Sequence, residues 1–247
     1  MWGEKYVTEP YYLNDKRDSI NSLVNNVSGL RQNLMSTPSI RGNKNFIFSD
    51  GLIMGQREKR YIKAALENVP CGTSILNWPC ERGQLLPLLK KLGYKVTSAD
   101  SCSYAIMQAR LYGGLLGEGC IDNTDDFRLL NIFQTGFDDN LFGAVIVNHM
   151  FYRYPESQKR RQILKELRRI CNGPIIISDF CNVIAYCAMY SETYKPSEYR
   201  IQDGVAFNRR FLEEEINNCG LVIDRWIPKI NLISRQACAV LVRDKDL

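Results

Sequence analysis

The stretch from Thr73 to Asp100 constrains the fold of this chain more than any other. Residues Thr73–Leu76 are a short β-branched and apolar run of the kind that forms buried strands. Leucines at helical spacing predict a helix over 84–92, and a second strand over 95–99 ends at Asp100. A strand, a turn, a helix and a second strand ending in an acid make up a nucleotide-binding βαβ unit, in which the acid binds ribose hydroxyls.

Size and composition indicate a soluble globular protein with one large domain. The chain has 247 residues, of which 45% are hydrophobic and 24% charged. A net charge of +5 is too small to indicate a nucleic-acid partner. Because no apolar run has the length of a membrane span or the pattern of a signal peptide, we expect no membrane span and a cytoplasmic location.

The nine cysteines form no C-x-x-C pair, and several lie within apolar runs. We therefore expect buried free thiols in a reducing compartment, with no metal centre and no disulfide framework.

The stretch around Asp100 resembles the first half of a class I S-adenosylmethionine (SAM)-dependent methyltransferase. In that family the first strand usually ends in an acid, a turn with two or three glycines follows, and an acid after the second strand binds the ribose of SAM. Asp100 matches the second acid. Asn77 stands in place of the first acid, Glu81 occupies a glycine position, and Gly83 is the glycine that remains.

A second resemblance covers residues 131–148. Phe142–Asn148 is apolar almost throughout and predicts a fourth strand covered on both faces. Asn131 stands where the family has the acid that accepts a hydrogen bond from the adenine amino group. Gly143 replaces the acid of a Phe-Asp pair that opens the fourth strand in the family.

These substitutions change what the implied cofactor site can do. Asn77 keeps an oxygen acceptor but lacks the charge that favours the SAM ammonium group. Glu81 places a Cβ and a carboxylate where close backbone approach and positive φ are expected, and Arg82 could offset that charge or bind the SAM carboxylate. The residues that the resemblance implies for the cofactor are Asn77, Cys80, Glu81, Arg82, Gly83, Asp100, Ser101, Asn131, Ile132 and Asn148.

The candidate catalytic residues follow the fourth strand, where the family places groups that face the methyl acceptor. His149 is the only histidine of the chain, so an imidazole base has to be this residue. Tyr152 is the second candidate, with Tyr154 nearby and Asp179 after the fifth strand as further alternatives. A histidine packed beside the strand, without a catalytic role, is the structural alternative.

The remaining elements complete an α/β fold: a Rossmann-like, seven-stranded methyltransferase sheet, mostly parallel, with an antiparallel C-terminal hairpin. We expect Gly113 and Gly114 to end the second crossover helix, and Arg160 to lie on the outer, basic face of its helix. Helices are predicted over 58–66, 101–113, 156–170 and 208–218, a weak third strand near 119–121, and later strands over 174–178, 221–227 and 237–242.

Two domains are predicted. Residues 1–57 form an N-terminal helical segment, either a lid over the site or a packing helix, and residues 58–247 form the methyltransferase-like domain. An insertion at about 181–207, rich in tyrosine and methionine, would bind the acceptor or form core or a dimer face.

Two functions fit the sequence. The first is a SAM-dependent methyltransferase that acts on a small-molecule or lipid-like acceptor. The second is a methyltransferase fold that has lost SAM binding and catalysis and serves as a binding or scaffolding subunit, because Asn77, Glu81, Asn131 and Gly143 all depart from the family pattern. A homodimer or another protein partner is compatible with either function.

Overall fold

The computed structural model describes residues 56–115, 126–148, 150–180, 198–201, 204–207, 209–227 and 237–245. The chain divides into two compact units, residues 1–47 and 48–247, and every described residue belongs to the second unit. Residues 1–55 of the predicted N-terminal segment, His149 and most of the predicted insertion lie outside the described residues, as do the side chains of Tyr152 and Asp179.

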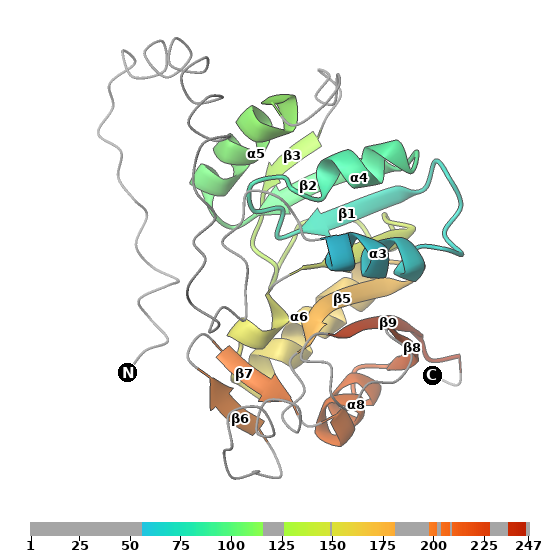
Figure 1. The fold of residues 1–247 in the computed structure, drawn as a ribbon. Helices are drawn as coiled ribbons and strands as arrows, with labels where there is room; N and C mark the ends of the chain where they lie inside the picture. The colour runs from blue at the N-terminus through green and yellow to red at the C-terminus, as the bar shows by residue number, and fades with distance from the viewer. Residues whose placement is uncertain are drawn as a thin grey trace. The chain divides into compact units, whose positions relative to one another are not determined.

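Within the described part of the chain, seven strands form one sheet in the order β3-β2-β1-β4-β5-β9-β8 (Figure 1). Central strand β1 pairs in parallel with β2 and β4, whereas β9 runs antiparallel to both β5 and β8. The strand order and the C-terminal hairpin confirm the predicted fold class. The strands are β1 (Ser74–Trp78), β2 (Lys95–Asp100), β3 (Asp126–Leu129), β4 (Ala144–Val147), β5 (Ile175–Phe180), β8 (Leu221–Ile227) and β9 (Ala237–Arg243).

The helices agree with the predicted positions to within a few residues. Helix α4 starts one residue before Pro87, where a missing backbone N–H breaks no intrahelical hydrogen bond. The helical elements are α3 (Gln56–Ala65), α4 (Leu86–Lys91), α5 (Ser103–Leu115), the short 3-10 turn η1 (Phe151–Arg153), α6 (Ser157–Ile170) and α8 (Arg209–Asn217).

The two faces of the sheet carry separate core clusters, because successive strand residues point to opposite sides. Ile75 and Ile146 pack on the face covered by α3 and α4, together with Ile62 and Leu89 of those helices. The alternate residues, Leu76 and Val147 among them, pack on the face covered by α6 and α8. Strands covered on both faces are apolar throughout, as the sequence of β4 predicted.

The outer part of the sheet differs from the prediction at one helix end. The third described strand is Asp126–Leu129, which pairs with β2, and the predicted segment near 119–121 lies outside the described residues. Its charged and exposed residues suit a short edge strand but give no apolar run to recognise. Helix α5 continues through Gly113 and Gly114 to Leu115, since glycine weakens a helix without having to end it.

Arg160 is buried, contrary to its predicted place on an exposed basic face. Its side chain is 1% exposed and forms a bidentate ion pair with Glu215 of α8, with N–O distances of 2.8 and 3.0 Å. It also donates to the carbonyls of Tyr154 and Pro155, each at 2.8 Å. Arg160 therefore ties α6 and α8 to the segment that follows β4.

Near the segment after β4, β6 (Glu198–Ile201) and β7 (Gly204–Phe207) form a separate two-stranded antiparallel sheet. β7 packs against η1. No helix in the described ranges combines the length and the apolar character that crossing a membrane would require.

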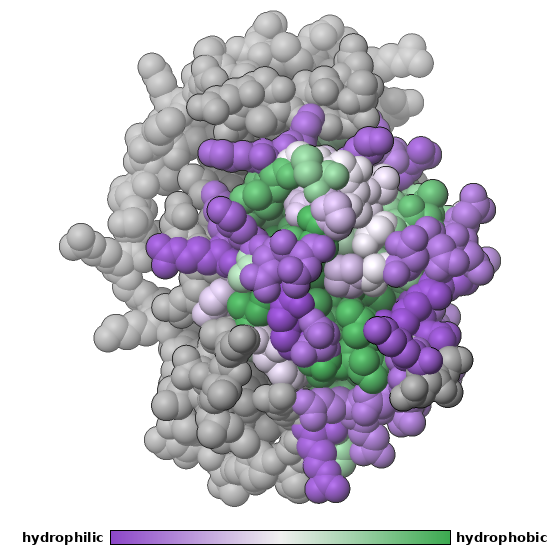
Figure 2. All heavy atoms as spheres, turned by 90° about the vertical axis from the view of Figure 1, so that its right-hand side faces the viewer, coloured by the Kyte–Doolittle hydropathy of each residue, from purple (hydrophilic) through white to green (hydrophobic). Residues whose placement is uncertain are grey.

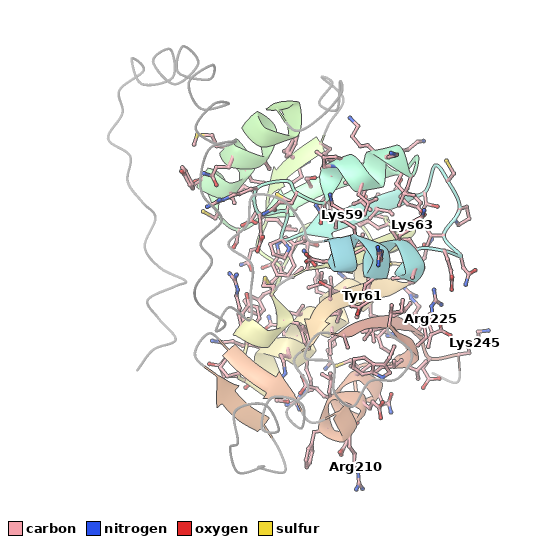
Figure 3. All side chains as sticks on the ribbon, in the orientation of Figure 1. Lys59, Tyr61, Lys63, Arg210, Arg225 and Lys245 are labelled. Carbon is pink, nitrogen blue, oxygen red and sulfur yellow. The ribbon has the colours of Figure 1, made fainter. Side chains whose placement is uncertain are left out.

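On the face of the second unit shown in Figure 2, hydrophilic side chains project between apolar ones. Figure 3 shows Lys59 and Lys63 on α3 and Arg225 on β8. Arg225 donates to the carbonyl of Ala65 at 3.1 Å and pairs with Glu67 at 3.8 Å, so this basic side chain fastens β8 to the end of α3.

Candidate functional site

Asp100 ends β2 and lies at the carboxyl edge of the sheet, where ligands of open α/β folds bind. It is 6% exposed. One carboxylate oxygen accepts the N–H of Glu81 at 3.0 Å, and the other accepts the N–H of Cys102 at 2.9 Å. Burial raises the pKa of Asp100, and the N–H groups of Cys102, Glu81 and Ser101 and the charge of Arg153 partly offset that rise. Since a carboxylate has about four lone-pair sites, Asp100 keeps capacity to accept a ribose hydroxyl.

The turn after β1 keeps the backbone geometry of a glycine-rich loop despite its altered residues. Glu81 adopts a φ of +47°, which a non-glycine residue rarely does, and Gly83 has a φ of +78°. A Cβ on Gly83 would lie 3.2 Å from Cα of Ala109, so a glycine lets α5 approach the turn closely. The N–H of Cys80 donates to the carbonyl of Ala99 at 2.7 Å and fixes the turn to β2.

The Glu81 side chain is directed toward η1, the segment that follows β4. Its carboxylate lies 3.9 Å from the guanidinium of Arg153, with side-chain exposures of 33% and 56%. Arg82, which the sequence suggested as the partner for this charge, is exposed.

A row of buried polar side chains crosses the sheet near this edge. Asn77 of β1 is 1% exposed, and neither atom of its amide has a hydrogen-bond partner in the described chain. The hydroxyl of Ser98, in register with Asn77 on β2, is also unpartnered there. Asn148 after β4 accepts a hydrogen bond from the hydroxyl of Ser178 on β5. Unpartnered buried polar atoms next to Asp100 are what a site for a polar ligand would present.

The loop after β3 reaches the same edge. The N–H of Leu130 donates to the carbonyl of Asp100 at 2.8 Å. Asn131 is exposed, and its amide oxygen accepts the N–H of Phe133 at 3.0 Å, while Ile132 is buried. The amide oxygen that was predicted to accept from adenine thus has an intraloop donor and one lone pair left.

Tyr154 adds an aromatic hydroxyl to the edge. Its ring stacks edge-to-face on Phe133, with centroids 5.6 Å apart. Burial raises the pKa of Tyr154, the charge of Arg153 lowers it, and the charge of Asp100 raises it further.

Gly143 lies away from this edge, at the start of β4. A Cβ at this position would overlap the methyl group of Thr73. The glycine therefore has a packing role, which explains why the acid of the family's Phe-Asp pair is missing there.

The structure thus brings the loops after β1 and β2 together around Asp100, through the bonds of Glu81, Cys102 and Ala99 described above. Ser101 is exposed, and the Cys80 thiol is buried, which raises its pKa.

Sequence reasoning did not identify Arg153 or Ser178. A serine directly after three isoleucines in a buried strand was a usable signal for Ser178, whereas nothing in the sequence distinguishes Arg153 from the other surface arginines.

A family profile described as a methyltransferase domain matches residues 76–173. No curated protein sequence matches the chain.

Solved methyltransferases share the fold. The CcbJ methyltransferase from Streptomyces caelestis superposes with a TM-score of 0.61 at 10% identity, over 76% of this chain and 90% of that one. Magnesium protoporphyrin IX methyltransferase (ChlM) from Synechocystis PCC 6803, solved with bound S-adenosylhomocysteine (SAH), gives 0.59 at 15% identity, over 92% and 99%. The glycopeptide N-methyltransferase MtfA gives 0.59 at 14% identity, over 78% and 92%. The chain therefore has the class I SAM-dependent methyltransferase fold and carries, over residues 76–173, a match to the methyltransferase domain family.

Proposed function

We propose that this protein is a SAM-dependent methyltransferase that acts on a small-molecule or lipid-like acceptor. The observation that carries the proposal is the buried carboxylate of Asp100, held by N–H groups of two loops at the carboxyl edge of a methyltransferase sheet. A carboxylate fixed in this way can accept both hydroxyls of a ribose without rearranging.

We propose a role for several described residues in binding the parts of SAM. Asp100 would hold the ribose, and Ile132 and Asn131 would line the adenine side. SAM supplies a methyl group already activated by its sulfonium, so the protein contributes mainly alignment of donor and acceptor. A base is needed only where the acceptor has to lose a proton, and His149 and Tyr152 remain the proposed candidates, with Tyr154 beside them.

We infer the acceptor class from the structural neighbours and from the aromatic residues of two parts of the chain. Structural neighbours include enzymes named for a glycopeptide and for magnesium protoporphyrin IX. The aromatic pair of Phe133 and Tyr154, and the tyrosine- and methionine-rich residues at about 181–207, suit a largely apolar acceptor with a few polar contacts. We propose that residues 181–207 form the acceptor-side insertion.

Calorimetry with SAM and with SAH tests the proposal. We expect the wild-type protein to bind both ligands, and Asp100→Asn to weaken SAH by about tenfold or more, because a neutral amide cannot replace a charge-assisted acceptor of hydroxyls. Glu214→Gln, an exposed change on α8, is the matched control and should bind as the wild type does.

Thermal unfolding of Asp100→Asn, followed in parallel, separates loss of binding from loss of fold. If the wild-type protein gives no heat and no thermal shift with either ligand, the proposal is wrong.

The second candidate, a binding or scaffolding subunit without catalysis, is favoured by one observation. Asn77 lies buried and uncharged where the family carries an acid. Under this alternative, substituting glycine for Glu81 would leave SAM affinity undetectable, and a stable protein partner would co-purify with the native protein.

A further inference from the structure

A buried hydrogen bond joins two neighbouring parallel strands at the carboxyl edge of the sheet. The hydroxyl of Ser178 on β5 donates to the amide oxygen of Asn148, the residue that follows β4. The two residues are 4% and 6% exposed, respectively. A buried polar pair of this kind stabilises a fold little more than apolar side chains of the same shape would. The pair therefore points to a role beyond packing.

Asn148 lies in the same row of the sheet as Asp100. The registers of β1 with its two neighbours place Asp100 on one side of Pro79 and Asn148 on the other, roughly 10 Å apart across β1. The N–H of Asn148 donates to the carbonyl of Trp78 at 3.3 Å, so the pairing with β1 continues to this residue.

Asp100, Asn148 and Ser178 also belong to one face of the sheet. Successive strand residues alternate between the two faces. Ile146 and Ile176 pack on the face covered by α3 and α4, and Asn148 and Ser178 each come two residues after one of them. The same alternation along β2 places Asp100 on this face. A ligand that lies along the edge on this side of the sheet would therefore meet both Asp100 and Asn148.

The proposed orientation of the nucleoside directs its 5′ side toward Asn148. The loop after β3 would line the base and Asp100 after β2 would hold the ribose, so the 5′ carbon would extend over β1 toward β4. SAM carries its sulfonium, and with it the methyl group, on that carbon. The transferred methyl would thus lie beside Asn148, with the acceptor beyond it.

Ser178 determines which end of the Asn148 amide a ligand meets. Its hydroxyl occupies the amide oxygen, and no residue of the described chain accepts a hydrogen bond from the amide nitrogen. With the backbone of Asn148 tied to β1 and its oxygen tied to β5, the NH2 group is the part left for a ligand. An NH2 group offers two donors and no lone pair, so it favours an oxygen with lone pairs and disfavours an ammonium group.

We propose that Ser178 is a positioning residue that turns the NH2 group of Asn148 toward the transferred methyl and thereby selects an anionic oxygen, a carboxylate or phenolate, over a protonated amine as the acceptor. This inference rests on the proposed function and adds the chemical class of the acceptor group. A lone pair of the oxygen forms the new C–O bond while the C–S bond breaks, and the electrons of that bond return to sulfur, which gives SAH and a methyl ester or ether. The NH2 group of Asn148 donates to the acceptor oxygen and holds it in line. Because an anionic oxygen has no proton to lose, the step needs no base.

Paired calorimetric titrations with SAH and with sinefungin test the orientation of the amide. Sinefungin has an amine-bearing carbon in place of the sulfur, so an ammonium group stands where SAM carries its methyl. Ser178→Ala frees the amide to turn its oxygen toward this ammonium group and to form a charge-assisted hydrogen bond. We expect the affinity for sinefungin relative to SAH to rise about tenfold, and SAH itself to bind within about twofold of the wild type.

Further variants tie the result to the amide. Asn148→Ala removes the opposing donors and should raise the same ratio of affinities about threefold, and adding Ser178→Ala to it should produce no further change. Ser178→Thr keeps the hydroxyl and should retain the wild-type ratio. Ser74→Ala, at an exposed position at the opposite end of β1, is the matched control and should change neither affinity. Thermal unfolding of each variant without ligand shows whether its fold is retained.

The positioning role is disproved if Ser178→Ala leaves the ratio unchanged, weakens both ligands equally or shifts the ratio toward SAH. The last result would mean that the amide oxygen already faces the ligand in the wild-type protein. An unchanged ratio in Asn148→Ala also disproves the role, and this variant decides the question if Ser178→Ala does not fold. In all these cases the wild-type protein still binds SAH and the proposed function stands. If the wild-type protein binds neither ligand, the proposed function fails and the positioning role fails with it.

Discussion

At the scale of single residues, Glu81 adopts a backbone conformation that usually requires glycine. The turn needs a positive φ here, and Glu81 supplies it at +47°. A left-handed conformation costs an L-residue with a Cβ about 1–2 kcal/mol. The exposed ion pair with Arg153 contributes at most about 1 kcal/mol in return. A glycine at position 81 would not carry this strain.

Glu81→Gly is therefore expected to raise the free energy of unfolding by about 0.5–1 kcal/mol, because the relief of strain exceeds the lost ion pair and the extra freedom of glycine in the unfolded chain. Urea denaturation measures this change. Glu81→Ala is the matched control, since it removes the charge but keeps the Cβ, and it should be no more stable than the wild type. Equal stability of the alanine and glycine variants would contradict this prediction, because the strain at position 81 would then be no larger than the cost of glycine's extra freedom in the unfolded chain.

At the scale of elements, α6 holds the loop that follows β3. Glu166 of α6 accepts the N–H of Thr135 at 2.9 Å and its hydroxyl at 2.6 Å. Arg169 donates to the same carboxylate at 2.8 Å and pairs with Asp139 at 2.6 Å. The loop that carries Asn131 and Ile132 is thereby anchored to a helix whose buried face packs into the core.

This anchor should make the protein sensitive to acid. The hydrogen bonds from Arg169 and Thr135 lower the pKa of Glu166 from 4.5 to about 2. A lowered folded-state pKa gives stability that is fully present above about pH 4.5 and is lost as the pH falls toward about 2. Glu166→Gln should therefore cost about 1–2 kcal/mol at neutral pH and should reduce the loss of stability over that acidic range.

Urea denaturation at a series of pH values tests this prediction, with Glu214→Gln as the control for an exposed carboxylate. If Glu166→Gln loses stability with falling pH as steeply as the wild type does, the anchor is not responsible.

The sequence predicted an element well where burial gave that element a continuous run of apolar residues. β4 is apolar on both faces and was predicted directly, and Asp100 was placed by the strand before it. β3 is a short, charged edge strand, so no hydrophobic run revealed it. Arg160 lies one turn before Ile163 and Leu164, on the same stripe, so helical periodicity already indicated its burial. Its basic character led to the wrong interpretation, because a buried arginine needs a partner, and Glu215 comes from a distant part of the sequence.

At the scale of the whole molecule, the sheet order explains why distant residues share one edge. Parallel strands β2, β1, β4 and β5 all end at the same side, so their following loops meet there although they are separated in sequence (Figure 1). The sequence could identify single candidates in each loop. It could not show that Arg153 faces Glu81, because that pairing depends on the positions of two loops in the folded chain.

The most direct test of the central claim, that Asp100 holds the ribose of a SAM-type nucleoside, is a crystal structure of the protein with SAH. The account predicts both ribose hydroxyls within about 2.5–3.0 Å of the Asp100 carboxylate oxygens, the normal range for such hydrogen bonds. SAH bound with its ribose away from Asp100, or absent from this edge at saturating concentration, would contradict it.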